Sequence, residues 1–150
     1  MRIRLEKRRG ATVVECAVVY PLVFLLTLGL IICIMGVFRY QEVATLAREA
    51  CRYAAVHGGD YAKETGNTAP TPQEIYDQVI KPKSIALDPS QVTYSITYDK
   101  TNHPVHAIIS NGDVTYKYNT VTVVVTYRWI PELYWGGVTL QSSCSTQMSY

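Results

Sequence analysis

An uncharged stretch of 23 residues, 16–38, limits the fold of this chain more than any other feature of its sequence. As an α-helix with a rise of about 1.5 Å per residue it would be roughly 35 Å long, enough to cross a hydrocarbon core of about 30 Å. Core helices of soluble proteins seldom run this far without polar relief, and Tyr20 and Thr27 are the most polar side chains here. The apolar run of a signal peptide is shorter, roughly 7 to 15 residues, and precedes a small-residue cleavage site that is missing here. We therefore predict a membrane-spanning helix over residues 16–38.

The charges that flank this stretch predict its orientation. Five basic residues lie in the first nine positions, against Glu6 alone: Arg2, Arg4, Lys7, Arg8 and Arg9. Fewer follow the stretch, and they are more widely spaced: Arg39, Arg48 and Arg52. Because basic residues stay on the cytoplasmic side, we expect a cytoplasmic N-terminus and an exported chain after about Phe38. The basic cluster suits anionic lipid headgroups, and a net charge of +2 gives no reason to expect a nucleic-acid partner.

Two residues of this helix carry a free-energy cost in a membrane. Pro21 removes a helical hydrogen bond, which membrane helices tolerate when neighbouring groups satisfy the freed carbonyl. Glu15 places a carboxylate at the edge of the apolar run, where it costs up to about 2 to 3 kcal/mol if it lies deep. Either Glu15 reaches the headgroups, or it awaits a cationic partner on another chain.

The same region resembles a known family. Residues 8–15 read RRGATVVE, Tyr20-Pro21-Leu22 follows, and residues 46–55 read LAREACRYAA. This pattern resembles the leader and N-terminal helix of type IV pilins, and specifically the TadE-like pseudopilins of tight-adherence (Tad) pilus systems. The likeness extends over about residues 8–57, and more loosely over 120–150.

The resemblance implies a function and a set of partners. A prepilin peptidase would cut between Gly10 and Ala11, and Glu15 would then meet the new N-terminal amine of a neighbouring subunit. The chain would be a minor pilin or pseudopilin in the bacterial inner membrane, with its C-terminal domain periplasmic or extracellular. It would join a Tad-type pilus, a structure used in cell adhesion, through other pilin subunits and the Tad assembly platform. A stand-alone membrane-anchored binding module is the alternative of a different class.

Beyond the apolar stretch, no helix-breaking signal occurs before Gly58, so we expect one helix over about residues 11–57. Residues 1–10 then form a basic cytoplasmic leader and 58–150 an exported β-rich domain. Small residues share one side of the last helical turns: Val43, Ala44, Ala47, Ala50, Cys51, Ala54 and Ala55. This side can dock the chain's own sheet or the helix of another subunit.

The exported part begins with a predicted loop over residues 58–72, which is rich in Gly and Pro. Thr71 and Glu74 then have the spacing of a capping box, which predicts a short helix to about Ile80 that Pro82 ends. Strand-like segments follow over 92–99, 105–110, 113–118, 120–129 and 138–150. Asn111-Gly112, between the second and the third, is typical of a type I′ hairpin. We expect an α+β fold in which a small antiparallel sheet of about four strands packs against the long helix.

The four cysteines fall into two groups. Cys16 and Cys33 lie in the apolar stretch, where they serve most simply as small apolar side chains. Cys51 lies on the docking side of the helix, and Cys144 lies with the inward set of the last strand. If the sheet packs on the helix as expected, these two approach each other. An exported compartment would permit a disulfide between them, and two independent buried thiols are the alternative.

The sequence offers no catalytic, cofactor-binding or metal-binding set, so we predict a protein that is not an enzyme and has no cofactor. His103 and His106 have an H-x-x-H spacing, but on a strand this spacing puts the two side chains on opposite faces. Phosphate loops, nucleophile elbows and C-x-x-C pairs are missing from the sequence. The many tyrosines alternate with Ser and Thr, a pattern typical of strand packing or of an adhesive surface.

Overall fold

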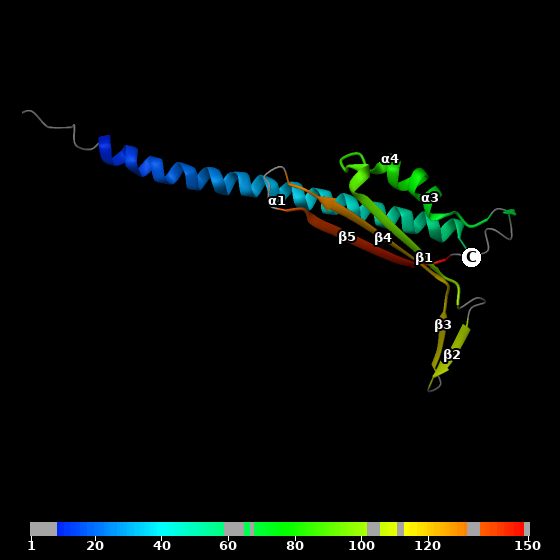
Figure 1. Cartoon of the computed structure of the whole chain (residues 1–150). Coiled ribbons are helices and arrows are strands. Elements are labelled where there is room, and N and C mark those ends of the chain that lie inside the picture. The colour runs from blue at the N-terminus through cyan, green and yellow to red at the C-terminus, as the bar shows by residue number, and fades with distance from the viewer. Residues whose placement is uncertain are drawn as a thin grey trace, which may run out of the picture. The chain divides into compact units, whose positions relative to one another are not determined.

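The computed structural model describes residues 9–58, 65–66, 68–101, 106–110, 113–131 and 136–148. These residues form two compact units, one that ends at Val37 and one that begins at Phe38. The elements of both units, drawn in Figure 1, are in chain order α1 (Arg9–His57), α3 (Pro72–Ile75), η1 (Tyr76–Ile80), α4 (Lys81–Lys83), η2 (Pro89–Gln91), β1 (Val92–Asp99), β2 (His106–Ser110), β3 (Asp113–Lys117), β4 (Thr120–Trp129) and β5 (Val138–Gln147).

Helix α1 is 49 residues long and contains Pro21 in its interior. It ends at His57, the residue at which the sequence predicts its end. The chain leaves the helix through Gly58, where a Cβ atom would lie 2.7 Å from the carbonyl oxygen of Ala54. Such an approach is too close for any side chain, so the exit from α1 depends on glycine at this position.

The sheet has three antiparallel strands in the order β1-β4-β5, with β4 in the centre (Figure 1). Strand β1 pairs with β4 over its whole length, from Val92 opposite Tyr127 to Asp99 opposite Thr120. Strands β2 and β3 form a separate two-stranded antiparallel pair. The α+β fold and the helix packed on a sheet are thus confirmed, with three strands in the main sheet where about four were expected. Strand β1 pairs directly with β4, and the β2–β3 pair that lies between them in sequence is not part of this sheet.

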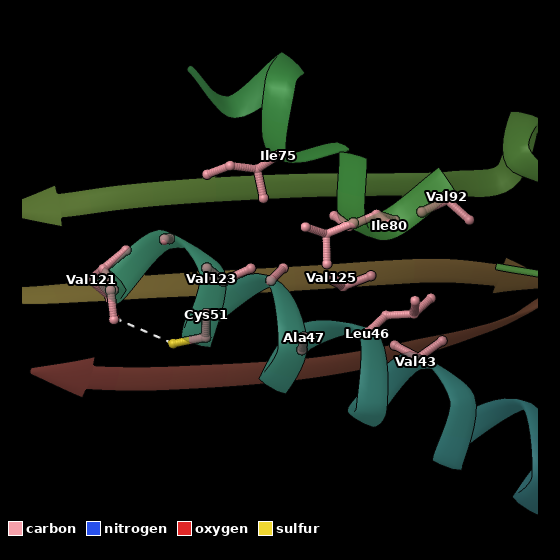
Figure 2. Packing of buried hydrophobic residues seen from close by; sticks show 14 of the residues in the cluster. Val43, Leu46, Ala47, Cys51, Ile75, Ile80, Val92, Val121, Val123 and Val125 are labelled. Atoms are coloured by element: carbon pink, nitrogen blue, oxygen red, sulfur yellow. Dashed lines mark hydrogen bonds between the residues drawn. The ribbon is translucent and has the colours of Figure 1, made fainter. Parts of the chain in front are cut away.

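The core lies between one face of the sheet and the C-terminal part of α1. In β4 the predicted alternation holds, because Val121, Val123 and Val125 are fully buried. Figure 2 shows these valines pointing toward the small residues of α1. The buried side chains of the helix are Val43, Leu46, Ala47, Ala50, Cys51, Ala54 and Ala55. Burying a Val or Leu side chain contributes about 1.5 to 3 kcal/mol, and burying an Ala contributes less. These residues form one core cluster with the β4 valines, so this side of the helix docks the chain's own sheet.

A short helical segment over residues 72–83 completes the core. Its start is the predicted capping box: the Glu74 amide donates to Thr71 Oγ1 at 3.3 Å, and the Thr71 amide donates to Glu74 Oε2 at 2.8 Å. Ile75 and Ile80 are fully buried and face the sheet (Figure 2). The prediction that Pro82 ends this helix is wrong, because α4 continues through it to Lys83. The wider π-helical turn η1 comes just before Pro82. Proline crowds the carbonyl four residues before it in a regular α-helix, and a wider turn leaves more room there.

Polar contacts fasten this segment and the loop after it to α1. The side chain of Lys83 forms an ion pair with Glu49. The guanidinium of Arg39 donates to the carbonyl oxygen of Ala86, and the Ala86 amide donates to Glu42 Oε1 at 3.1 Å. The loop after α4 is therefore held beside the first turns of α1 that follow Phe38.

Candidate functional site

The part of α1 before Phe38 is apolar on every side and exposed. Its large side chains remain mostly accessible to solvent, among them Val13, Val14, Val18, Tyr20, Leu22, Phe24, Leu25, Leu26, Leu30, Ile31, Ile34 and Val37. The helix is long and apolar enough to cross a membrane, and none of its most apolar 18-residue window is buried. Thr27 satisfies its hydroxyl within the helix, by donating to the carbonyl oxygen of Phe24 at 2.9 Å. A surface of this kind needs lipid or other apolar helices around it, so α1 is compatible with membrane anchoring.

Glu15 lies on this surface, one turn after the start of α1. Its side chain is exposed and has no ion-pair or hydrogen-bond partner among the described residues of the chain. A carboxylate on an otherwise apolar surface is costly in a membrane unless it finds a cation or reaches the headgroups. A cation for this carboxylate would therefore have to come from outside the described part of this chain.

Gly10 and Ala11, the predicted cleavage position, lie in the first turn of α1, and residues 1–8 of the leader fall outside the described residues. A Cβ atom at Gly10 would meet nothing within 4 Å. Glycine inside a helix costs roughly 0.5 to 1 kcal/mol relative to alanine. Packing within the described chain thus gives no reason for glycine here.

Pro21 lies inside α1 without ending it. It has no N–H to donate, so the carbonyl four residues before it loses its helical hydrogen bond. Around Pro21 the helix surface has a shallow apolar hollow lined by Tyr20, Val23, Phe24 and Thr27. Gly29 lies about two turns after Pro21, and a Cβ atom there would also meet nothing within 4 Å. This stretch of helix surface can therefore accept a closely approaching neighbour.

The two cysteines of the second unit meet, as the sequence predicts. Cys51 is fully buried, and its thiol lies 3.3 Å from the carbonyl oxygen of Cys144 and 3.7 Å from that of Val121. Figure 2 shows the Cys51 sulfur aimed at β4, with the contact to Val121 drawn. Burial, together with the neighbouring Cys144 thiol, raises the pKa of Cys51 to about 12. Both residues are free thiols in this structure, and the disulfide stays a prediction.

Sequence reasoning missed the surroundings of this cysteine pair. A groove of about 300 Å³ lies over both cysteines, and Arg48, Arg52 and Thr146 also line it. The sequence indicated part of this groove, because Arg48 and Arg52 lie one turn apart on α1 and flank Cys51 in sequence. The contribution of β5 could not be read from the sequence, since it depends on the strand register.

The H-x-x-H pair cannot be placed, because His103 and the side chain of His106 lie outside the described residues. Among the side chains that are described, no group of three His, Cys, Asp or Glu residues could hold a metal ion. The prediction of a protein without metal or cofactor stays a prediction.

These features define a class of protein: a small α+β domain built on the end of a long N-terminal helix whose other end is apolar and exposed. A family model described as TadE-like protein matches residues 10–52. The match begins at Gly10 and covers Glu15, Pro21 and most of α1, so the resemblance to TadE-like proteins is confirmed for this segment. Searches of curated proteins and of solved structures gave no match to this chain. The similarity indicates a pilin-like protein associated with a Tad pilus.

Proposed function

We propose that this chain is a minor pilin or pseudopilin, a structural subunit of a Tad-type pilus or secretion filament with no enzymatic activity of its own. The observation that carries the proposal is the TadE-like match over residues 10–52, on a helix whose apolar surface is unburied. In a filament, the apolar first part of α1 packs against the same part of other subunits. The β domain then faces outward, where it is available for adhesion.

The proposed topology follows from the charges at the two ends of the apolar stretch. The basic cluster at Arg2 to Arg9 stays in the cytoplasm, and α1 crosses the bacterial inner membrane over about residues 16–38. Residues 58–150 form the exported domain on the periplasmic or extracellular side. The bilayer is the first environment of α1, and other pilin subunits replace it in the filament.

Two steps of assembly are assigned to particular residues. A prepilin peptidase cuts between Gly10 and Ala11, which explains a glycine that the described packing does not require. Glu15 then pairs with the new amine at Ala11 of a neighbouring subunit, which supplies the cation that this chain lacks around the carboxylate. Pro21 and Gly29 lie where close helix packing between subunits is easiest. The assembly platform of the Tad system is the partner that inserts the subunit.

The sequence of the mature N-terminus tests this proposal. The protein is purified from its native membrane and its first peptide is sequenced. A chain that begins at Ala11 supports the pilin, and Gly10→Leu is expected to keep residues 1–10 attached without unfolding the β domain. An intact Met1 in the wild-type protein counts against processing and favours a stand-alone membrane-anchored binding module.

Incorporation into filaments tests the role of Glu15. Glu15→Ala is expected to insert into the membrane at normal levels but to be lost from sheared filaments. Val14→Ala is the matched control, because Val14 is the exposed neighbour of Glu15 and carries no charge. Normal incorporation of Glu15→Ala would refute the role assigned to this carboxylate.

A further inference from the structure

The groove over Cys51 and Cys144 belongs to the second unit, which begins at Phe38. Cys51 belongs to the fully buried side of α1, and Cys144 is half-buried on β5, opposite Val123 of the central strand. The two residues are 93 positions apart in sequence, yet the Cys51 thiol lies 3.3 Å from the Cys144 carbonyl oxygen. The Cys144 side chain also contributes to the raised pKa of the Cys51 thiol. Two cysteines on different elements are therefore in contact, through the Cys51 thiol and the Cys144 backbone.

The groove gives a reagent access to this pair. Its volume is about 300 Å³, and both cysteines line it. Arg48 and Arg52, which also line the groove, have exposed side chains. Two guanidinium groups favour an anionic reagent. The pair thus differs from buried thiols that no reagent can reach.

We propose that Cys51 and Cys144 are the site of an intrachain disulfide, formed through this groove by a thiol–disulfide oxidant and joining α1 to β5. The oxidant is a protein or small molecule that carries a reactive disulfide, which an exported compartment supplies. The inference depends on the proposed export only for this oxidant, and it is independent of pilus assembly.

The exposure of the two thiols sets the order of the steps. The thiolate of Cys144, the more accessible of the two, attacks one sulfur of the oxidant and displaces the other as a thiolate. The Cys51 thiol then gives up its proton and attacks the Cys144 sulfur, which releases the second sulfur of the oxidant. Two electrons pass to the oxidant, which leaves as two thiols, and the protons of Cys51 and Cys144 end on them. Cys51 acts second because its protonated state is strongly favoured while it stays buried.

The first test uses the full chain purified from cells in which the exported compartment is oxidising. The protein is denatured without reductant, treated with N-ethylmaleimide and mapped by mass spectrometry. Cys16 and Cys33 are expected to be modified, and one peptide pair is expected to join Cys51 to Cys144. Cys16→Ser and Cys33→Ser, the control variants, should keep that pair. Modification of all four cysteines in the wild-type protein would overturn the proposal.

The second test uses the purified, reduced full chain with oxidised glutathione, an anionic disulfide that matches the basic groove. Cys51→Ser is expected to trap glutathione on Cys144, and Cys144→Ser to leave Cys51 at least tenfold slower to react. Equal reaction rates at the two cysteines would refute the assigned order. If the wild-type chain stays reduced in this reaction, the disulfide between Cys51 and Cys144 is refuted, on whichever side of a membrane the domain lies. The proposed function is tested separately, by the mature N-terminus.

Discussion

The two parts of helix α1 differ sharply in what surrounds them. Before Phe38, apolar side chains are exposed on every side of the helix; after Phe38, one side is buried and the other carries charges such as Glu49 and Arg52. The second part is held by contacts within the chain, mainly with β4. The first part has no such contacts among the described residues of its own unit, and lipid or other apolar helices would suit the residues found there. One helix thus has two parts with different surroundings. The same substitution made in each part should therefore have different effects on the stability of the domain.

The largest effect is expected from shortening a buried leucine. Leu46→Ala leaves a cavity in a site that is 2% exposed and should lower the free energy of unfolding of the domain by about 2 to 5 kcal/mol. Leu26→Ala, its counterpart in the first part, is 62% exposed and should change this value by less than about 0.5 kcal/mol. Denaturant unfolding in detergent, followed by tryptophan fluorescence, measures both. Equal losses would show that the two parts do not differ as described.

Adding volume should produce the next largest difference. Ala50 is fully buried against the sheet, so Ala50→Leu is expected to cost about 1 to 3 kcal/mol by overpacking. Ala17→Leu adds the same atoms to an exposed position and should leave domain unfolding unchanged. Thermal unfolding of the two variants gives the comparison. If Ala50→Leu were neutral, the sheet would have to lie farther from α1 than it does here.

Removing the capping box tests how much the segment over residues 72–83 contributes to the stability of the domain built on the second part of α1. Thr71→Ala removes the oxygen that accepts the Glu74 amide and should cost about 1 kcal/mol. Thr97, exposed on the outer face of β1, is the control position for the same substitution. Denaturant midpoints would show the difference, and equal midpoints would mean that this helix start is irrelevant to stability.

The smallest effect is expected at the ion pair between Lys83 and Glu49. Both side chains are about half exposed, with 54% and 40% of their surface accessible, so the pair should contribute about 0.2 to 1 kcal/mol. A double-mutant cycle with Lys83→Ala and Glu49→Ala isolates this coupling. It should fall further in high salt, and a salt-independent coupling would mean that the contact is not electrostatic.

Sequence periodicity was sufficient for the elements themselves. The alternation in residues 120–129 predicted which valines of β4 are buried, and Gly58 marked the end of α1. The capping box at Thr71 was also readable, because its two hydrogen bonds join residues three positions apart. Each of these features depends on neighbours close in sequence, which is why the sequence alone revealed them.

Features that depend on partners far apart in sequence were less predictable. Alternation shows which way a side chain faces but not which strand lies beside it, so it could not show that the β2–β3 pair lies outside the main sheet. Leu46 was missing from the predicted docking side, because that side was defined by a stripe of small residues to which leucine does not belong. The contact of Arg39 with Ala86 joins a helix to a loop 47 positions away, and no local pattern signals it.

The late position of β4 and β5 in the sequence sets an order for folding during synthesis. The side of α1 around Cys51 is made first, and it is covered by strands 70 to 93 residues further on. Until those strands have been made, the alanine-rich side of the helix stays bare and open to wrong partners. A nascent chain stalled before Thr120 should therefore require a chaperone, whereas release of the last strands should end that need.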